Sequence, residues 1–351
     1  MASEQTLQDT FGRTIRDLRI SITDRCNFRC LYCLPETEEA ANFYQDRFKP
    51  DQAKPINYTW KPKERFLTYE EIEQLCSTLA ALGIDKIRIT GGEPLLRRNV
   101  ESLIAKLHAI PGIRDIALTT NGFLFPEKAE ALRAAGLSRV TISLDSLDRD
   151  NFKKLTGKDG LDLVLKSIER AKELDFRPIK LNAVIIRHLN DHEIEDLARF
   201  AAEHEVSMRF IEFMPLDSSR AWQRDHVVSG KEILERLNQS FDLQPIVSNN
   251  PAETAQRWSI AGSAGEIGII APVTEAFCGH CNRIRLTADG QIRTCLFSLK
   301  EHDIKGLLRS GADPQAITAR LRDIVHQKEE RHHIGESDFQ QPDRTMSYIG
   351  G

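Results

Sequence analysis

Short apolar runs alternate with longer amphipathic stretches over residues 18–214. The runs are rich in β-branched residues and are bounded by polar or glycine-containing segments, which is typical of strands in a buried sheet. The predicted strands span 18–23, 86–90, 115–119, 140–144, 179–185 and 208–213. Six β-α units in series predict a parallel sheet with helical crossovers, either open or curled toward a barrel.

The stretches between these strands repeat apolar residues every three or four positions, as amphipathic helices do. Thr68 and Glu71 form a capping-box pattern, and Gly83 indicates the end of that helix. Apolar stripes at 100–107 and 161–171 predict two more helices. Asp191 is predicted to cap the helix that follows it.

The pattern changes beyond Leu216. A helix near 229–238 precedes β-rich sequence, and Ala288-Asp289-Gly290 separates two alternating runs at 283–287 and 291–295, which predicts a hairpin. Helices are expected at 303–309 and 314–326, with a small flexible tail at 346–351. The chain is therefore divided into an α/β region, 1–216, and a β-rich and helical extension, 217–351.

One segment interrupts the α/β rhythm. Residues 36–64 are polar, contain proline and carry scattered aromatic side chains. This stretch is long for a loop in a compact domain, so it is interpreted as an insertion, either a lid or a mobile loop of undefined role.

Composition restricts the classes of function. The 351 residues are 40% hydrophobic and carry a formal net charge of −4, which gives no general attraction to nucleic acid or to membrane surfaces. No run approaches 18 apolar residues, and residues 1–19 lack the apolar core of a secretory signal. The chain is expected to be cytoplasmic, and any anion must be bound by a local group of Arg and Lys.

Six of the seven cysteines fall into two trios. The first trio is Cys26, Cys30 and Cys33, directly after the first predicted strand, and the second is Cys278, Cys281 and Cys295. The predicted hairpin returns Cys295 to the other two. Three ligands leave one position of a metal centre open, as catalytic sites require, whereas structural zinc normally has four. A zinc site with its fourth ligand elsewhere is the alternative. Cys76 lies on an apolar helix face and is predicted to pack in the core.

The first trio, with Tyr32 inside it, resembles the signature of radical S-adenosylmethionine enzymes. Thr90-Gly91-Gly92-Glu93-Pro94 at the end of the second strand resembles a second motif of that family. The resemblance implies a partial (βα)6 TIM-like barrel and a [4Fe–4S] cluster held by the first trio. It also implies S-adenosylmethionine bound to that cluster and contacted by residues at six matching positions: Tyr32, Gly91, Gly92, Glu93, Ser143 and Met214.

The second trio resembles one branch of the family, the GTP 3′,8-cyclases of molybdenum cofactor biosynthesis, and this resemblance covers nearly the whole chain. It implies a second [4Fe–4S] cluster on Cys278, Cys281 and Cys295 whose open iron binds the guanine of GTP. It also implies seven GTP contacts, at Arg19, Arg88, Thr119, Lys180, Arg283, Ile284 and Arg285. A terminal pair, Gly350 and Gly351, is implied to reach into the active site.

Three of the basic positions also carry an independent pattern. Arg283 and Arg285 are two residues apart on a predicted strand, so they share a face and could grip phosphate, or they could form a solvated face. Arg19 alternates with Leu18 and Ile20 and is expected to point into the sheet's interior. A buried Arg requires an anionic partner, either a ligand or an internal salt bridge.

The expected activity follows from the branch. It is a lyase reaction in which an adenosyl radical takes H-3′ of the GTP ribose and the carbon radical attacks C8, with a reductant completing 3′,8-cyclo-7,8-dihydro-GTP. The resemblance implies a homodimer, an external electron donor and a downstream enzyme that forms the cyclic pyranopterin. Three alternatives remain: a radical enzyme that matures a peptide, an electron carrier, and a zinc-stapled nucleic-acid module.

Overall fold

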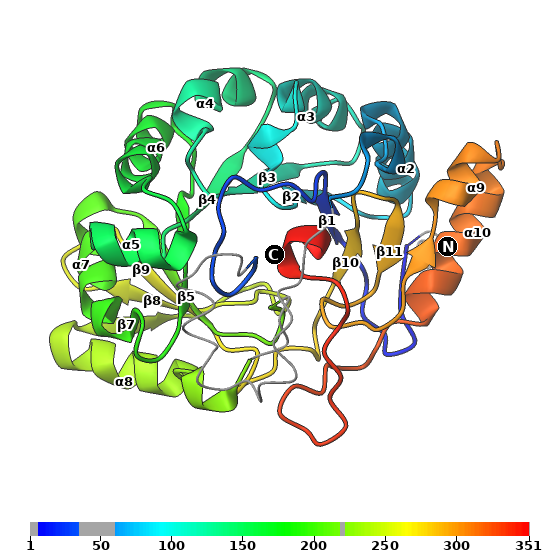
Figure 1. Ribbon diagram of the computed structural model, residues 1–351. Coiled ribbons are helices and arrows are strands. Elements are labelled where there is room, and N and C mark those ends of the chain that lie inside the picture. The colour runs from blue at the N-terminus through cyan, green and yellow to red at the C-terminus, as the bar shows by residue number, and fades with distance from the viewer. Residues whose placement is uncertain (1–5, 35–59, 218–221, 351) are drawn as a thin grey trace.

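The computed structural model describes residues 6–34, 60–217 and 222–350. Its strands form one continuous sheet in the order β12-β11-β10-β1-β2-β3-β4-β5-β6-β9-β8-β7. Figure 1 shows the sheet curving around a central space, with the helices on its outer side and the C-terminus near the middle of the ring. The site described below lies in this central space.

Six parallel strands in chain order form the middle of the sheet. They are β1 (Asp17–Ser21), β2 (Lys86–Thr90), β3 (Asp115–Thr120), β4 (Arg139–Ser143), β5 (Lys180–Ile185) and β6 (Ser207–Glu212). The predicted strands match these bounds within two residues, and the prediction of a partial barrel of six β-α units is confirmed. Side chains along a strand alternate between the two faces of the sheet. On β1, Leu18 and Ile20 are fully buried in the core under the helices, whereas Arg19 between them faces the central space.

The helices of the first 216 residues cover the outer face of the sheet (Figure 1). They are α2 (Tyr69–Ala81), α3 (Val100–His108), α4 (Phe125–Ala134), α5 (Arg149–Thr156), α6 (Leu161–Glu173) and α7 (Ile194–His204), with short 3-10 turns η1 (Lys63–Arg65), η2 (Pro94–Leu96) and η3 (Asp191–Glu193). The predicted capping box is present, because Thr68 accepts from the backbone of Glu71 while Glu71 accepts from the backbone of Thr68. Cys76 is fully buried in the core, as predicted.

The C-terminal region extends the sheet at both of its ends. Beyond β6 come β9 (Glu266–Ile270), β8 (Gln256–Ile260) and β7 (Leu243–Ile246), and beyond β1 come β10 (Arg283–Leu286), β11 (Gln291–Arg293) and β12 (His302–Asp303). The helical elements of this region are η4 (Arg224–His226), α8 (Gly230–Ser240), α9 (Lys305–Arg309), α10 (Pro314–His326) and α11 (Met346–Ile349). The predicted hairpin is present as the antiparallel pair β10–β11.

Two local predictions are wrong. Asp191 lies within η3 instead of capping α7, and its carboxylate accepts from the backbone N–H of His188. The helix predicted from Asp303 begins at Lys305, because His302–Asp303 pairs with β11 as a strand. The predicted tail contains the turn of α11, with Tyr348 and Ile349 buried, and its flexibility stays a prediction. Most of the predicted insertion, residues 36–59, lies outside the described residues.

Within the described ranges, no helix combines the length and the apolar character that crossing a membrane requires.

A substitution at Gly290 tests the turn between β10 and β11, which brings Cys295 back beside Cys278 and Cys281. Its φ is +82°, and a Cβ atom there would collide with the side chain of Lys305. We expect Gly290→Ala to lower the free energy of unfolding by about 3 kcal/mol, from left-handed strain plus overpacking. Gly311→Ala is the matched control, since Gly311 has a φ of +72° and open space, and should cost about 1 kcal/mol. Urea unfolding measures both, and equal losses would contradict the collision.

Candidate functional site

The two cysteine trios lie at opposite ends of one cavity. The first trio follows the carboxyl end of β1, whereas Cys281 precedes β10, which runs parallel to β1 with Asp17 beside Arg283. Cys295 follows β11, which runs back antiparallel to β10, and so returns to the end where Cys281 lies. The cavity has a volume of about 280 Å³, and all six cysteines line it as free thiols.

Close backbone packing fixes the loop that carries the first trio. The N–H of Gly92 donates to the carbonyl of Thr23 over 2.8 Å, and that of Glu93 donates to Arg25 over 2.7 Å. A Cβ on Gly92 would lie 2.6 Å from the carbonyl carbon of Arg25, and one on Gly91 would lie 2.5 Å from the carbonyl oxygen of Thr23. Both glycines are therefore required by the approach of the cysteine loop itself.

Glu93 links the turn after β2 to the turn after β3 through hydrogen bonds. Its carboxylate is fully buried and accepts hydrogen bonds from the backbone of Leu95 and Asn121 and from the hydroxyl of Thr120. Burial raises the pKa of Glu93 to about 7. Asn121 also points its amide nitrogen at the sulfur of Cys26, 3.8 Å away. Burial raises the pKa of Cys26 to about 11, with the nearby Glu93 carboxylate adding to the effect.

The second trio lies in a different electrostatic environment. Burial raises the pKa of Cys281, but the cations of Arg283 and Lys328 outweigh this and lower it to about 6. A guanidinium nitrogen of Arg283 lies 3.4 Å from that sulfur. A thiolate is the form that binds metal, so Arg283 and Lys328 favour the ligating state at this end of the cavity.

The sulfur atoms of each trio lie farther apart than the ligands of a single zinc ion. Tetrahedral zinc with Zn–S bonds of about 2.3 Å brings its sulfur ligands to about 3.8 Å from one another. Among the residues that the structure describes, no three cysteine sulfurs lie within 4.8 Å of one another. A centre built of several metal ions holds its thiolates farther apart than one zinc ion does, so this spacing is compatible with the predicted clusters, which stay a prediction.

Three arginines stand in register on adjacent strands between the trios. Arg19 on β1 lies beside Arg285 on β10 and beside Arg88 on β2, and all three line the cavity. In the described part of the chain, Arg19 forms no ion pair with a carboxylate, so the internal salt bridge weighed as its alternative partner is absent. Burial lowers the pKa of Arg88 to about 9, with the charge of Arg19 adding to the effect.

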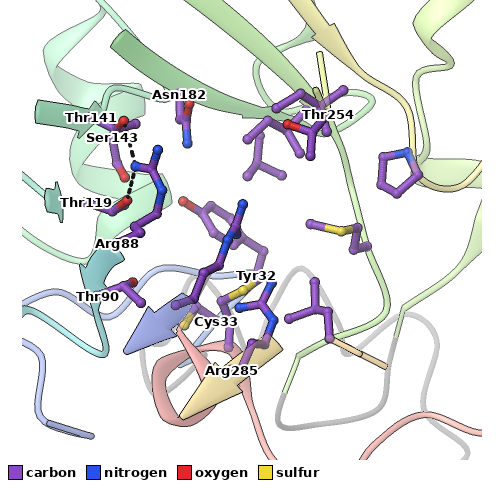
Figure 2. A pocket seen from close by; sticks show the side chains of 18 of the residues that line it. Tyr32, Cys33, Arg88, Thr90, Thr119, Thr141, Ser143, Asn182, Thr254 and Arg285 are labelled. Carbon is purple, nitrogen blue, oxygen red and sulfur yellow. Dashed lines mark hydrogen bonds between the residues drawn. The ribbon is translucent and has the colours of Figure 1, made fainter. Parts of the chain in front are cut away.

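Arg88 is held by neutral partners. It donates to the hydroxyls of Thr119 and Thr141, each over 3.0 Å, as Figure 2 shows. Burial lowers the pKa of Lys180 to about 6, and the nearby charges of Arg209 and Arg88 add to this effect. Such a group of cations disfavours its own charge, and an anionic ligand would relieve the repulsion.

Most predicted site residues meet in this cavity. Those that line it are Arg19, Cys26, Cys30, Tyr32, Cys33, Arg88, Gly91, Gly92, Thr119, Ser143, Met214, Cys278, Cys281, Arg283, Arg285 and Cys295. Glu93, Lys180 and Ile284 do not line it, and Ile284 is fully buried in the core. The carbonyl of Gly350 accepts from the guanidinium of Arg285, and Gly351 lies outside the described residues.

Sequence reasoning missed several polar residues of the cavity. Arg209 lines it, and its guanidinium nitrogen lies 4.0 Å from the carboxylate of Glu253. Asn182 points a side chain into it from β5 (Figure 2). The period-two alternation of β5 and β6 could have predicted both residues. Asn182 lies two positions from Lys180 on β5, and Arg209 lies two positions from Ile211 on β6, so each pair shares a face of the sheet. Asp145 accepts from the phenol of Tyr32 over 2.7 Å, a contact that no local pattern signals.

Known proteins match the chain along its length. Residues 20–201 match the model of the Radical SAM superfamily, and residues 206–334 match that of Molybdenum Cofactor Synthesis C. The chain is 44% identical to the GTP 3′,8-cyclase of Rhodopirellula baltica over 100% of this chain and 94% of that protein. It is 43% identical to the GTP 3′,8-cyclase of Thermodesulfovibrio yellowstonii over 98% of this chain and 100% of that protein.

Among solved structures, Streptococcus suis SuiB bound to S-adenosylmethionine has a TM-score of 0.58 at 14% identity, covering 95% of this chain and 77% of that chain. This likeness is one of fold.

Gly92 tests how the first cysteine loop is positioned. We expect Gly92→Ala to lower the free energy of unfolding by about 3 kcal/mol, because the added methyl group displaces the backbone at Arg25. In the metal-free chain, the displaced loop should also let Cys26 react faster with iodoacetamide, as followed by mass spectrometry. Gly279→Ala is the control, since no atom lies within 4 Å of its Cβ position. Unchanged reactivity in Gly92→Ala would refute this account of the loop.

Proposed function

We propose, because this chain belongs to the GTP 3′,8-cyclase family of radical S-adenosylmethionine enzymes, that it converts GTP to (8S)-3′,8-cyclo-7,8-dihydroguanosine 5′-triphosphate, the first step of molybdenum cofactor biosynthesis. One observation carries the proposal: a single cavity has a cysteine trio at each end and, between them, a row of arginines that form no ion pair with a carboxylate of the described residues. A nucleoside triphosphate carries the negative charge that such a row would bind.

The cysteines would hold two [4Fe–4S] clusters, one on Cys26, Cys30 and Cys33 and one on Cys278, Cys281 and Cys295. The first cluster, when bound, supplies the low-potential electron that cleaves S-adenosylmethionine. Asn121 directs its amide at the sulfur of Cys26, and Arg283 directs its guanidinium at that of Cys281, so each cluster would have a polar neighbour on a ligand sulfur.

S-adenosylmethionine would bind at the carboxyl ends of the first strands. Tyr32, Gly91, Gly92, Ser143 and Met214 line this part of the cavity. Glu93 would act from beneath, because its three hydrogen bonds fix the turns that carry Gly92 and Asn121. Within this motif, Gly91 and Gly92 would contact S-adenosylmethionine directly, and Glu93 would support them.

The triphosphate would lie along the arginine row. Arg19, Arg88 and Arg285 present guanidinium groups at one level of the barrel, and Arg283 extends the row toward the second trio. Thr119 and Arg209 line the same cavity and complete the proposed GTP environment, whereas Lys180 lies outside its lining and Ile284 faces the core. Planar guanidinium groups bind phosphate oxygens in pairs and lose little by desolvation when they do so. The protein's contribution is to hold the ribose between the two ends and to exclude water.

Residues 1–216 and 217–351 would act as two functional regions, each supplying one trio. As a cytoplasmic lyase and homodimer, the protein would need an external electron donor, and it would pass its product to a cyclic pyranopterin-forming enzyme. Anaerobic reconstitution with iron and sulfide, followed by incubation with GTP, S-adenosylmethionine and dithionite, tests the activity. Formation of 5′-deoxyadenosine together with the cyclised nucleotide supports the proposal, whereas 5′-deoxyadenosine without any GTP-derived product would overturn it.

Iron content tests the number of clusters. We expect roughly eight iron and eight sulfide ions per reconstituted chain, and roughly four of each in Cys26→Ala and in Cys295→Ala. Cys26→Ala should make no 5′-deoxyadenosine, because the first trio is incomplete. Iron and sulfide analysis with chromatography of the nucleosides measures these outcomes. A full complement in either variant would exclude that cysteine from ligation.

Arg88 tests the anion site. Replacing Arg88 with Met removes a cation whose described partners are hydroxyls, so GTP affinity should fall roughly 10- to 100-fold, the range for charge-assisted hydrogen bonds. Arg139→Met is the control, because Arg139 is paired with Asp115 and does not line the cavity. Calorimetric titration of the reconstituted variants measures the affinity. Equal GTP binding by Arg88→Met and the unmodified chain would remove Arg88 from the site.

A further inference from the structure

The C-terminal turn, residues 345–350, is built into the cavity wall. Ile349 is fully buried, and the guanidinium of Arg285 donates to the carbonyls of Ile349 and Gly350. A Cβ on Gly350 would overlap the side chain of Thr90 at the end of β2. Figure 1 shows this turn in the middle of the ring, beside β1 and β10. The chain end therefore packs against the strands that carry the proposed GTP and S-adenosylmethionine contacts.

The same turn also contacts the first cysteine trio. Burial raises the pKa of Cys33 to about 12, and the nearby backbone N–H and hydroxyl of Ser347 oppose that rise. Ser347 is almost fully buried. Hydrogen bonds to a ligand sulfur orient it and adjust its electron density, so the position of this turn matters for Cys33 as well as for Arg285.

Tyr348 anchors the turn through two cations. The ammonium of Lys61 lies 4.9 Å from the centre of the Tyr348 ring, and the guanidinium of Arg344 lies 5.0 Å from it. The carboxylate of Asp24 accepts a hydrogen bond from the backbone N–H of Lys61 over 3.0 Å, which fixes the backbone beside the first of these cations. Cation–π contacts of this kind gain strength when the ring is shielded from water, and Tyr348 is only 8% exposed.

One carboxylate, that of Asp289, contacts both cations. Asp289, in the turn between β10 and β11, accepts from Arg344 over 2.8 Å and 3.1 Å and from Lys61 over 2.5 Å. The hydroxyl of Thr287 donates to it over 2.6 Å. The Asp289 side chain is 9% exposed, so these bonds are largely shielded from solvent. Without this carboxylate, Lys61 would lose the carboxylate that binds it beside the ring, whereas Arg344 would keep its second ion pair, with Glu301 at 2.6 Å.

We propose that Asp289 is a positioning residue that acts through Lys61, Arg344 and Tyr348 to hold the C-terminal turn against Cys33 and Arg285. We name these four residues the C-terminal latch. Lys61 comes from the segment after the first cysteine loop, Asp289 from the β10–β11 turn, and Arg344 directly precedes the C-terminal turn. The latch thus joins three distant parts of the chain at the end of the cavity where the first trio lies. Its importance for catalysis rests on the proposed function, but its effect on the turn does not.

Carboxypeptidase digestion of the full chain tests the latch without any cluster or substrate. In Asp289→Asn, free isoleucine and tyrosine from Ile349 and Tyr348 should appear at least about tenfold faster, the change expected when a shielded charge pair loses one partner. Asp289→Glu keeps the charge and should restore most of the protection. Asp159→Asn is the matched control, because Asp159 pairs with Arg149 at the surface. Equal release from Asp289→Asn and Asp159→Asn would overturn the proposal.

A second variant protects the test against a folding defect. Arg344→Gln leaves Asp289 paired with Lys61 and should give a release rate between those of the unmodified chain and Asp289→Asn. Urea unfolding monitors the global stability of each variant. Faster release that merely follows a fall in global stability would count against a latch, whereas faster release at unchanged stability supports it.

A double-mutant cycle in the reconstituted enzyme tests the catalytic role. Asp289→Asn and a chain that ends at Tyr348 should each lower kcat, and combining them should lower it no further, because both changes remove the same contact with Arg285. Additive losses would show that Asp289 acts independently of the turn and would overturn the positioning role. If the unmodified chain forms no cyclised nucleotide, the proposed function fails while the carboxypeptidase result still decides the latch.

Discussion

The parallel pairing of β1 with β10 is the interaction on which the rest of the structure depends. Its register sets Arg19 beside Arg285, and the pairing of β1 with β2 adds Arg88 to the same row. Because β10 starts where β1 starts, Cys281 lies at the end opposite the first trio. A shift by one residue would turn every side chain of β10 to the other face, which would bury Arg285 among the core residues and expose Ile284 to the cavity.

This register has an electrostatic cost. Each cation withdrawn from water without a partner costs several kcal/mol, and the described carboxylates near the arginine row are few. Arg88 donates hydrogen bonds to the hydroxyls of Thr119 and Thr141, and these neutral groups leave its positive charge uncompensated. A carboxylate in their place would stabilise the unliganded fold and would compete with a phosphate for the same guanidinium. The barrel thus retains positive charge for an anionic ligand at the expense of its own stability.

Local patterns in the sequence predicted much of this arrangement. Period-two alternation located the six strands and the inward Arg19, and Asp289-Gly290 located the hairpin that returns Cys295. The errors arose where tertiary contacts override local preference: the Asp191 carboxylate binds the backbone of His188 instead of capping α7. The burial of Tyr348 was missed because its partners are remote. Lys61 and Asp289 are 228 residues apart, and no local pattern relates them.

The turn between β10 and β11 serves both ends of the cavity. Its geometry, with Gly290 at φ +82°, reverses the chain so that β11 carries Cys295 back to the second trio. The adjacent Asp289 binds Arg344 and Lys61, the two latch cations that flank the ring of Tyr348 in the C-terminal turn. A hairpin needs only a residue that adopts a left-handed conformation at this point, so the turn alone does not require the buried carboxylate. Its pairing with two distant cations is explained by the need to seat the chain end where both Cys33 and Arg285 can reach it.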